Sequence, residues 1–353
     1  MKNFKGFFLS FIIAVVLALL LIAGLVIYVD PFFQYHAPLS WFPYVVDDQV
    51  DMNPGLAKNT DYDSILLGSS MTVNFNTDWF EEYMGLDTVK LSYNGAYPKD
   101  QSNIMSIVFD AKGDRVKRVF LGIDEMNYSG DIEETKYPIT DYLYDDNKLN
   151  DVNYIFNKDV ILDYCIKPLI DRSDATDWNL TYPFWWQDEH YSKALVLMYY
   201  EPCEKAESEP DTQAFIDAIG ANLDANILPY IEAHPETTFT IFYPPYSILY
   251  WNDVNNRKEL TAVIEKYRYM TERLLEYDNV EVYFFQNNEE IICDLNNYAD
   301  YTHYHGRICE YMVSCFADGT HRVTEENLEE ELEVLYELAR DYDYDAIWDD
   351  WYN

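Results

Sequence analysis

The hydrophobic pattern of this chain divides into short apolar runs and longer segments with helical periodicity. Five runs have the length of a strand, are rich in β-branched and aromatic residues, and are bounded by turn-forming residues. Between and after them, apolar positions recur three and four residues apart, which predicts helices. The predicted strands are residues 64–68, 88–93, 117–124, 238–243 and 279–285, and the predicted helices include residues 100–111, 211–233, 256–276 and 324–342.

Strands that alternate with helices favour an α/β fold, in which a parallel sheet is covered by helices on both faces. The last helix is the most regular of these elements. Thr324 is its expected N-cap, and glutamates follow in the first turn, where the helix dipole favours negative charge. Its expected buried stripe consists of Leu328, Leu332, Leu335 and Ala339.

The first 29 residues differ from the rest of the chain. Lys2 and Lys5 precede an uncharged run, Phe7 to Val29, which as a helix rising about 1.5 Å per residue is long enough to cross a bilayer. A cleavable signal peptide is the alternative, but the run ends in "GLVIYVDPFF" without a small-x-small cleavage pattern. We therefore predict a single transmembrane anchor with a cytoplasmic N-terminus in residues 1–29, and an extracytoplasmic domain in residues 30–353.

The charged residues lie almost entirely after this anchor. Residues 30–353 hold all 63 acidic residues and all but two of the 24 lysines and arginines, and the formal net charge of the chain is −39. A surface this acidic argues against a nucleic-acid partner, because the phosphate backbone needs lysine and arginine. The five cysteines form no C-x-x-C pair, which favours neither a zinc site nor a dense disulfide framework.

Residues 126–210 do not follow the alternation of strands and helices. They have few clean periods and many aromatic residues, so we interpret them as an insertion after the third strand. In an open α/β sheet, the loops after the carboxyl ends of the strands surround the ligand crevice. The insertion is therefore expected to wall the site or to face a partner.

A glycine and two serines follow the first predicted strand, in "ILLGSSMT". A serine in a tight turn between a strand and a helix exposes its hydroxyl, and the backbone N–H groups of the turn can stabilise an oxyanion. Ser69 and Ser70 are also able to cap the helix that follows. The turn by itself leaves both interpretations open.

Two of the six histidines lie in "DYTHYH", residues 300–305, after the last predicted strand. Asp300 and His303 are three residues apart, so within one turn the carboxylate can orient the imidazole as a base for a serine. His305 would share a face with His303 in an extended segment, but the offset from Asp300 favours His303. The alternative is a polar loop with two surface histidines.

Together, the "GSS" block after the first strand and the D-x-x-H block after the last resemble the first and last blocks of the SGNH (GDSL-like) hydrolases. The single N-terminal span, "DPFFQYH" and "LLGSSMTVNF" resemble membrane-anchored members from Gram-positive bacteria that are related to DltD, the protein of teichoic acid D-alanylation. This resemblance implies a flavodoxin-like three-layer α/β/α sandwich with a parallel five-stranded sheet. It also implies an activity on acyl esters.

Carried over position by position, the resemblance makes Ser70 the nucleophile, His303 the base and Asp300 its orienting carboxylate. The oxyanion hole would take the backbone N–H groups of Ser70 and Gly95, with Asn94 beside them.

The third family block departs from the pattern. It usually reads Gly-x-Asn-Asp and its asparagine donates to the oxyanion, whereas residues 122–125 read "GIDE" and place Asp124 there. Because a carboxylate would repel an oxyanion, Asp124 is expected to hold the nucleophile loop or to contact substrate. Asn94 or Asn127 would then supply the missing donor.

The loop "FYPPYSILYW" follows the fourth predicted strand, at the ligand edge of the sheet. Two prolines stiffen it and its rings are suited to sugar contacts, so Tyr243 and Tyr246 are candidate substrate-binding residues. A packed, rigid turn is the alternative interpretation.

These observations predict a membrane-anchored, extracytoplasmic serine esterase or O-acyltransferase that needs no cofactor and no metal. Its expected substrate is an acylated cell-surface polysaccharide or teichoic-acid-like polymer, and the resemblance adds a membrane-bound O-acyltransferase as a partner. A non-catalytic glycan-binding or assembly subunit is the alternative, supported by Asp124. A metal-dependent hydrolase is disfavoured, because no His/Asp ligand spacing is evident.

Overall fold

The computed structural model describes residues 2–173 and 190–348, and the chain divides into two compact units. Unit 1 comprises Met1–Asp61 with Tyr137–Asn179, and unit 2 comprises Tyr62–Lys136 with Leu180–Asn353. The predicted insertion is therefore shared between the two units, and its residues 174–189 lie outside the described part. The position of the insertion beside the site stays a prediction. The single outer domain of residues 30–353 also stays a prediction.

Unit 2 is built on a six-stranded sheet in the order β2-β1-β3-β4-β5-β6. The first five strands are parallel, and the short edge strand β6 pairs antiparallel with β5. The parallel strands are almost entirely buried, in keeping with their continuous apolar runs. The strands are β1 (Ser64–Leu67), β2 (Thr88–Lys90), β3 (Arg118–Gly122), β4 (Thr238–Tyr243), β5 (Val280–Phe284) and β6 (Arg322–Val323).

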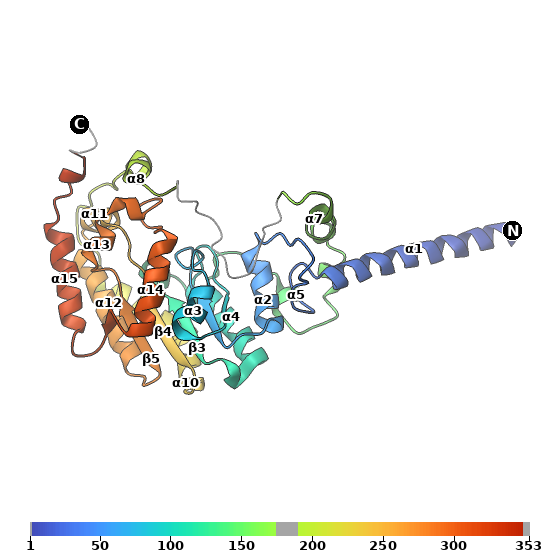
Figure 1. The fold of residues 1–353 in the computed structure, drawn as a ribbon, viewed down its shortest axis with the longest axis horizontal. Coiled ribbons are helices and arrows are strands. Elements are labelled where there is room, and N and C mark those ends of the chain that lie inside the picture. Colours follow the sequence, from blue (N-terminus) through green and yellow to red (C-terminus); the bar gives the residue numbers. More distant parts are fainter. Residues whose placement is uncertain (1, 174–189, 349–353) are drawn as a thin grey trace. The chain divides into compact units, whose positions relative to one another are not determined.

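The helices of unit 2 follow the strands along the chain (Figure 1). The longer ones are α3 (Asp78–Met84), α4 (Pro98–Lys112), α8 (Lys193–Tyr199), α9 (Thr212–Asn226), α10 (Leu228–Ala233), α11 (Ile248–Asn256), α12 (Leu260–Leu275), α14 (Gly306–Asp318) and α15 (Leu328–Asp341). Single turns are η1 (Gly113–Arg115), η2 (Glu125–Ser129), α13 (Glu289–Ile292) and η5 (Leu295–Asn297).

These helices cover both faces of the sheet. The register of β3 and β4 places Phe120 and Tyr243 on opposite faces, because successive residues of a strand alternate. Phe120 packs against Phe80 of α3 and Phe316 of α14, with ring centroids 4.5 and 5.6 Å apart. Tyr243 packs against Tyr267 of α12, at 4.9 Å. The mixed α/β class that was predicted is confirmed.

The predicted strands match β1 to β5, but the prediction of a five-stranded sheet is wrong, because β6 forms a sixth strand. β6 has two residues, too few to show a hydrophobic pattern. One predicted helix, residues 211–233, is divided at Ile227 into α9 and α10. Pro229 lies in the first turn of α10, where its missing N–H costs no hydrogen bond, whereas in a continuous helix it would leave a carbonyl unpaired.

The C-terminal helix begins later than predicted. α15 starts at Leu328, and Thr324 is not its N-cap: both the N–H and the hydroxyl of Thr324 donate to Oδ1 of Asn327. The predicted buried stripe is confirmed, since Leu328, Leu332, Leu335 and Ala339 are all buried.

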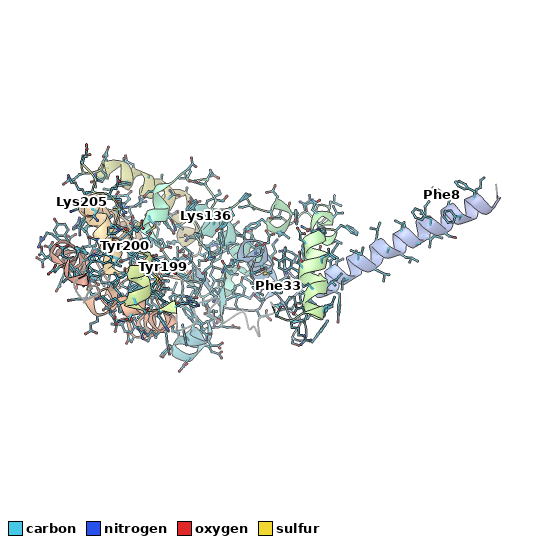
Figure 2. All side chains as sticks on the ribbon, turned by 90° about the horizontal axis from the view of Figure 1, so that it is seen from above. Phe8, Phe33, Lys136, Tyr199, Tyr200 and Lys205 are labelled. Carbon is cyan, nitrogen blue, oxygen red and sulfur yellow. The ribbon has the colours of Figure 1, made fainter. Side chains whose placement is uncertain are left out.

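Unit 1 begins with the long helix α1 (Lys2–Val29), whose segment Phe4–Val29 is long and apolar enough to cross a membrane or to be a signal sequence. Figure 2 shows the outer part of this helix, with Phe8, extending away from the other elements of unit 1. The other elements of unit 1 are α2 (Gln49–Asn59), α5 (Asp141–Tyr144), α6 (Val152–Ile155), the π-helix η3 (Val160–Ile166) and α7 (Lys167–Ile170).

The chain turns sharply after α1, around the buried carboxylate of Asp30. This carboxylate accepts the backbone N–H groups of residues 34–36, at 2.6 to 3.0 Å, and the hydroxyl of Tyr154, at 3.0 Å. The hydroxyl of Tyr154 in turn accepts the N–H of Phe32, at 3.0 Å. "DPFFQYH" is thus a turn that ties the end of α1 to the segment that contains α6.

Candidate active site

The turn after β1 contains Ser69 and Ser70, and hydrogen bonds hold Ser69 in place. Thr72 donates both its N–H and its hydroxyl to the carbonyl of Ser69, at 3.1 and 2.9 Å. The N–H of Met71 donates to Oγ of Ser69, at 3.2 Å. Ser69 is buried and stabilises the turn, whereas Ser70 remains partly exposed. The partly exposed serine is thus Ser70, the residue predicted as nucleophile, and the buried one is Ser69.

Two glycines make room for Thr72. Gly68 has a φ of +151°, and a Cβ there would lie 2.6 Å from Cγ2 of Thr72. A Cβ on Gly122, at the end of β3, would lie 2.7 Å from the same methyl group. Real Cβ atoms do not approach so closely, so both glycines are needed for the turn to lie against the ends of β1 and β3.

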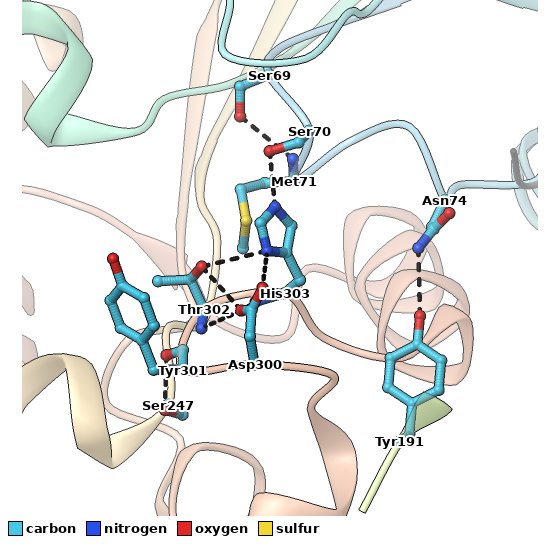
Figure 3. Close-up of polar contacts among 10 residues, drawn as sticks. All are labelled: Ser69, Ser70, Met71, Asn74, Tyr191, Ser247, Asp300, Tyr301, Thr302 and His303. Carbon is cyan, nitrogen blue, oxygen red and sulfur yellow. Dashed lines mark hydrogen bonds and ion pairs between the residues drawn. The ribbon is translucent and has the colours of Figure 1, made fainter. Parts of the chain in front are cut away.

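Ser70, His303 and Asp300 form a continuous hydrogen-bonded relay (Figure 3). Oγ of Ser70 lies 2.8 Å from Nε2 of His303, and Nδ1 of His303 lies 2.7 Å from Oδ2 of Asp300. With the imidazole proton on Nδ1, Nε2 can accept the serine proton. The structure thus brings together, across 233 positions of sequence, the three residues predicted as nucleophile, base and orienting carboxylate.

The loop before α14 holds the carboxylate of Asp300 in place. Its Oδ1 accepts the backbone N–H groups of Thr302 and His303, both at 2.8 Å, which leaves Oδ2 for the imidazole. Burial would raise the pKa of Asp300, but the hydrogen bond and charge of His303, with these two N–H groups, lower it to about 2. Asp300 is therefore ionised at neutral pH.

The environment of His303 makes it a stronger base than a free histidine. Burial lowers its pKa, but the hydrogen bond and charge of Asp300, together with the charge of Asp124, outweigh burial and raise the pKa above 6.5. A general base is most effective when its pKa lies near the working pH. The two carboxylates thus favour proton transfer from Ser70 to His303.

Asp124 follows β3 and contacts the turn of Ser69 and Ser70. It is buried, its Oδ1 accepts the hydroxyl of Tyr246 at 2.5 Å, and its side chain is hydrogen-bonded to Ser69. Burial raises the pKa of Asp124, while the bonds from Ser69 and Tyr246 and the charge of His303 act in the opposite direction. These contacts favour the expectation that Asp124 holds the loop over the expectation that it contacts substrate.

Tyr243 and Tyr246, the candidate substrate contacts, are both buried. The hydroxyl of Tyr243 is hydrogen-bonded to Thr271, at 3.1 Å, and that of Tyr246 to Asp124. The structure therefore offers no exposed ring at either position for a sugar. The loop between them has the character of the packed, rigid turn that was the alternative interpretation.

The turn after β2 lies next to the nucleophile turn, since the N–H of Tyr93 donates to the carbonyl of Gly68 at 3.4 Å. Asn94 and Gly95 form its corner, and Gly95 has a φ of +68°, a conformation that favours glycine. Asn127, the other expected donor, directs its amide to the carbonyl of Ala96, at 3.4 Å. The roles of Gly95 and Asn94 in an oxyanion hole stay predictions.

His305 has a structural contact in place of a contact with the serine. Its Nδ1 accepts the N–H of Arg307, at 3.0 Å, and so caps the N-terminus of α14. Its ring packs against Tyr191, with centroids 4.4 Å apart. The choice of His303 over His305 therefore agrees with the geometry.

Sequence reasoning missed Lys90, which holds the segment that follows the turn of Ser69 and Ser70. Its buried ammonium donates to the carbonyls of Val73 and Phe75, at 2.7 and 2.9 Å. Burial lowers the pKa of Lys90 to about 7. A lysine in the middle of the apolar run "TVKLSY" was the available signal, because a buried lysine needs polar partners.

A cavity of about 230 Å³ lies at the same edge of the sheet. Its walls come from segments that adjoin the relay: Glu125 follows Asp124, and Tyr301 follows Asp300. Buried Glu125 is paired with Lys266 and with the hydroxyl of Tyr250. The cavity is lined by charged and aromatic side chains, among them Glu125, Phe215, Tyr250, Arg257, Lys266 and Tyr301.

The fold and the site define a mixed α/β protein with a serine–histidine–aspartate relay at the carboxyl edge of its parallel strands. No protein-family model and no curated protein matches the sequence. Among solved structures, the chain is similar to a candidate platelet activating factor from Streptococcus pneumonia, at 10% identity and a TM-score of 0.37. That match covers 78% of this chain and 92% of the other, and a likeness this distant adds no argument to those from geometry.

Proposed function

We propose that this protein is a membrane-anchored, extracytoplasmic serine esterase or O-acyltransferase of the SGNH type, with Ser70 as nucleophile. The relay of Ser70, His303 and Asp300 is the observation that carries the proposal. The order of the blocks also supports it, since the nucleophile follows β1 and the base follows β5, as in a flavodoxin-like SGNH sandwich. The antiparallel β6 extends such a sheet at one edge without altering the parallel strands.

In the proposed reaction, His303 removes the proton of Ser70 as Oγ attacks the acyl carbonyl. The tetrahedral oxyanion is stabilised by the N–H groups of Ser70 and Gly95, with Asn94 nearby. The protonated imidazole, stabilised by Asp300, then protonates the leaving alcohol. In the second half, His303 deprotonates water or a glycan hydroxyl as its oxygen attacks the acyl-serine. The imidazolium then returns the proton to Oγ of Ser70 as the bond between Oγ and the acyl carbon breaks.

We further propose that the acyl group belongs to an ester of a cell-surface polysaccharide or teichoic-acid-like polymer. Aromatic and charged walls of the neighbouring cavity are suited to a polar, hydroxylated ligand. The length and apolar character of α1 support anchoring by a single span, with unit 2 outside the cell. A membrane-bound O-acyltransferase as partner rests on the family resemblance alone.

A non-catalytic subunit on the same fold is the second candidate. The observation that favours it is Asp124, which occupies the position of the oxyanion asparagine and is committed to Tyr246 and Ser69. Such a protein would keep the relay geometry without turnover.

A serine-reactive fluorophosphonate probe applied to the purified full-length chain tests the proposal. We expect Ser70 to be labelled, Ser70→Ala to abolish labelling, and His303→Ala to slow it by roughly 10²- to 10⁴-fold, the usual contribution of a general base. His305→Ala is the matched control and should label at the unaltered rate. A chain whose Ser70 is inert, with the cellular role of Ser70→Ala intact, would be the non-catalytic subunit.

A further inference from the structure

In unit 1, η3 continues directly into α7, and this helical segment, Val160–Ile170, exposes apolar side chains to solvent. Leu162 is 45% exposed, Leu169 is 47% exposed and Ile170 is 81% exposed. Together with the half-buried Ile166, they lie about one helical turn apart and so share one face. Exposed apolar side chains that gather on one face are typical of a surface that contacts a partner or a membrane.

The opposite face of this segment packs against the end of α1 and the turn that follows it. Val160 and Cys165 are buried, and the ring of Tyr164 contacts Phe32 of that turn, at 4.9 Å between centroids. On α1, the buried side chains are Val26 and Val29, in its last two turns. Most of α1 before these turns is exposed. The segment is therefore fixed at the point where α1 ends.

The length of α1 determines the level of that point in a bilayer. Phe4–Val29 has 26 residues. At about 1.5 Å per residue they form a helix of about 39 Å, which exceeds the hydrocarbon thickness of about 30 Å. The last turns of α1 then lie in the headgroup region, and the segment packed against them lies at the same level. In Figure 2 this segment, pale green beside Phe33, crosses the line of α1 and so would run along a membrane surface.

Two further aromatic residues of unit 1 lie at this level. Tyr28, in the last turn of α1, and Trp41 are 59% and 52% exposed, and their ring centroids are 6.2 Å apart. Exposed tyrosine and tryptophan are typical of the membrane–water interface, where their rings are partly buried among headgroups.

We propose that the helical segment Val160–Ile170 is an interfacial membrane helix, whose stripe of Leu162, Ile166, Leu169 and Ile170 inserts among lipid headgroups and acyl chains. The proposal rests on the proposed anchoring by α1. Its occupant is lipid because the segment that carries the stripe is fixed against the end of a helix of membrane-spanning length. Apolar burial provides the attraction, as in other interfacial helices, since the net charge of −39 does not favour anionic lipid.

The test is photolabelling of the full-length chain in phosphatidylcholine vesicles with a membrane-soluble diazirine, followed by peptide mapping. We expect labels in α1 and in Val160–Ile170. The peptide with Met198 and Tyr199, 60% and 75% exposed in unit 2, should stay unlabelled. Replacing Leu169 and Ile170 by glutamate should abolish labelling of the segment and leave that of α1 unchanged. Replacing Met198 and Tyr199 by glutamate is the matched control and should change neither.

The outcomes separate this inference from the anchor on which it rests. Labelling of α1 without Val160–Ile170 overturns the interfacial helix and leaves the anchor intact. If α1 itself is unlabelled, the anchor fails and this inference with it. Covalent linkage of the segment to a second copy of the chain, in place of lipid, would show a protein interface and also overturn the inference.

Discussion

The hydroxyl of Tyr246 donates a hydrogen bond of 2.5 Å to Oδ1 of Asp124. Both side chains are buried, and the side chain of Asp124 also bonds Ser69, next to the nucleophile. Tyr246 is therefore directed into the protein, and Asp124 connects the loop after β4 with the turn after β1. The charge of Asp124 also reaches His303 and raises the pKa of that imidazole.

Asp124→Asn tests this electrostatic effect. Only neutral His303 can accept the proton of Ser70, so reactivity increases as the pH rises through the pKa of His303. Asp124→Asn removes one of the two negative charges that raise this pKa, and so the rise should shift to lower pH. The asparagine can still accept from Tyr246. The measurement is the rate of fluorophosphonate labelling against pH, and an unmoved profile would show that Asp124 carries no charge.

Gly122→Ala should distort the turn of Ser69 and Ser70 through Thr72, which is bonded to Ser69. The new methyl group would lie 2.7 Å from Cγ2 of Thr72 and 3.1 Å from Phe242, so Thr72 is pushed away from the end of β3. Overpacking of this kind costs about 1–3 kcal/mol of stability. We expect slower labelling of Ser70 and a lower midpoint of urea unfolding.

Thr72→Ser provides the rescue for Gly122→Ala. Serine lacks the clashing methyl group but keeps the hydroxyl that bonds the carbonyl of Ser69. In the double variant, labelling and stability should return most of the way to the original values. Gly68→Ala with Thr72→Ser should not recover, because the φ of +151° at residue 68 is strained for alanine. Equal recovery of the two double variants would show that the backbone conformation of residue 68 does not require glycine.

His305→Ala should separate stability from reactivity. The imidazole caps α14 through the N–H of Arg307, and loss of a helix N-cap costs about 1 kcal/mol. The relay does not include His305, so the labelling rate of Ser70 should be unchanged while the urea midpoint falls. His303→Ala should show the reverse pattern. A labelling loss in His305→Ala that matched His303→Ala would make both histidines part of the relay.

The elements that the sequence predicted well are those defined by local patterns. β1 to β5 are continuous apolar runs. In α15 the apolar residues recur at a helical period, so they lie on one face of the helix. The relay was predicted because two short blocks together resemble the SGNH hydrolases, and this resemblance assigned the roles of Ser70, His303 and Asp300. Their positions agree with it, since parallel strands bring their carboxyl ends to one edge of the sheet and Asp300 and His303 are within one turn.

The remaining features depend on contacts that no local pattern records. In a strand buried on both faces, nothing in the sequence indicates the direction of a side chain, so Tyr243 was not separable from a residue at the surface. β6 has two residues and is formed by its pairing with β5. The grouping of 137–179 with the N-terminal residues comes from contacts between residues far apart in the sequence, such as Tyr154 with Asp30.

Tyr154→Phe tests that grouping. The hydroxyl donates to Asp30 and accepts from the N–H of Phe32, and both partners are buried. Its removal leaves Asp30 with one donor fewer and the N–H of Phe32 unpaired, a cost of about 1–3 kcal/mol for buried polar groups. Hydrogen exchange should therefore become faster in residues 30–36, while the ring continues to pack on Phe32.

Tyr164→Phe is the matched control. It loses only a hydrogen bond to the exposed carboxylate of Asp47, so little effect on hydrogen exchange is expected. Unchanged exchange in residues 30–36 would mean that the turn after α1 holds without Tyr154.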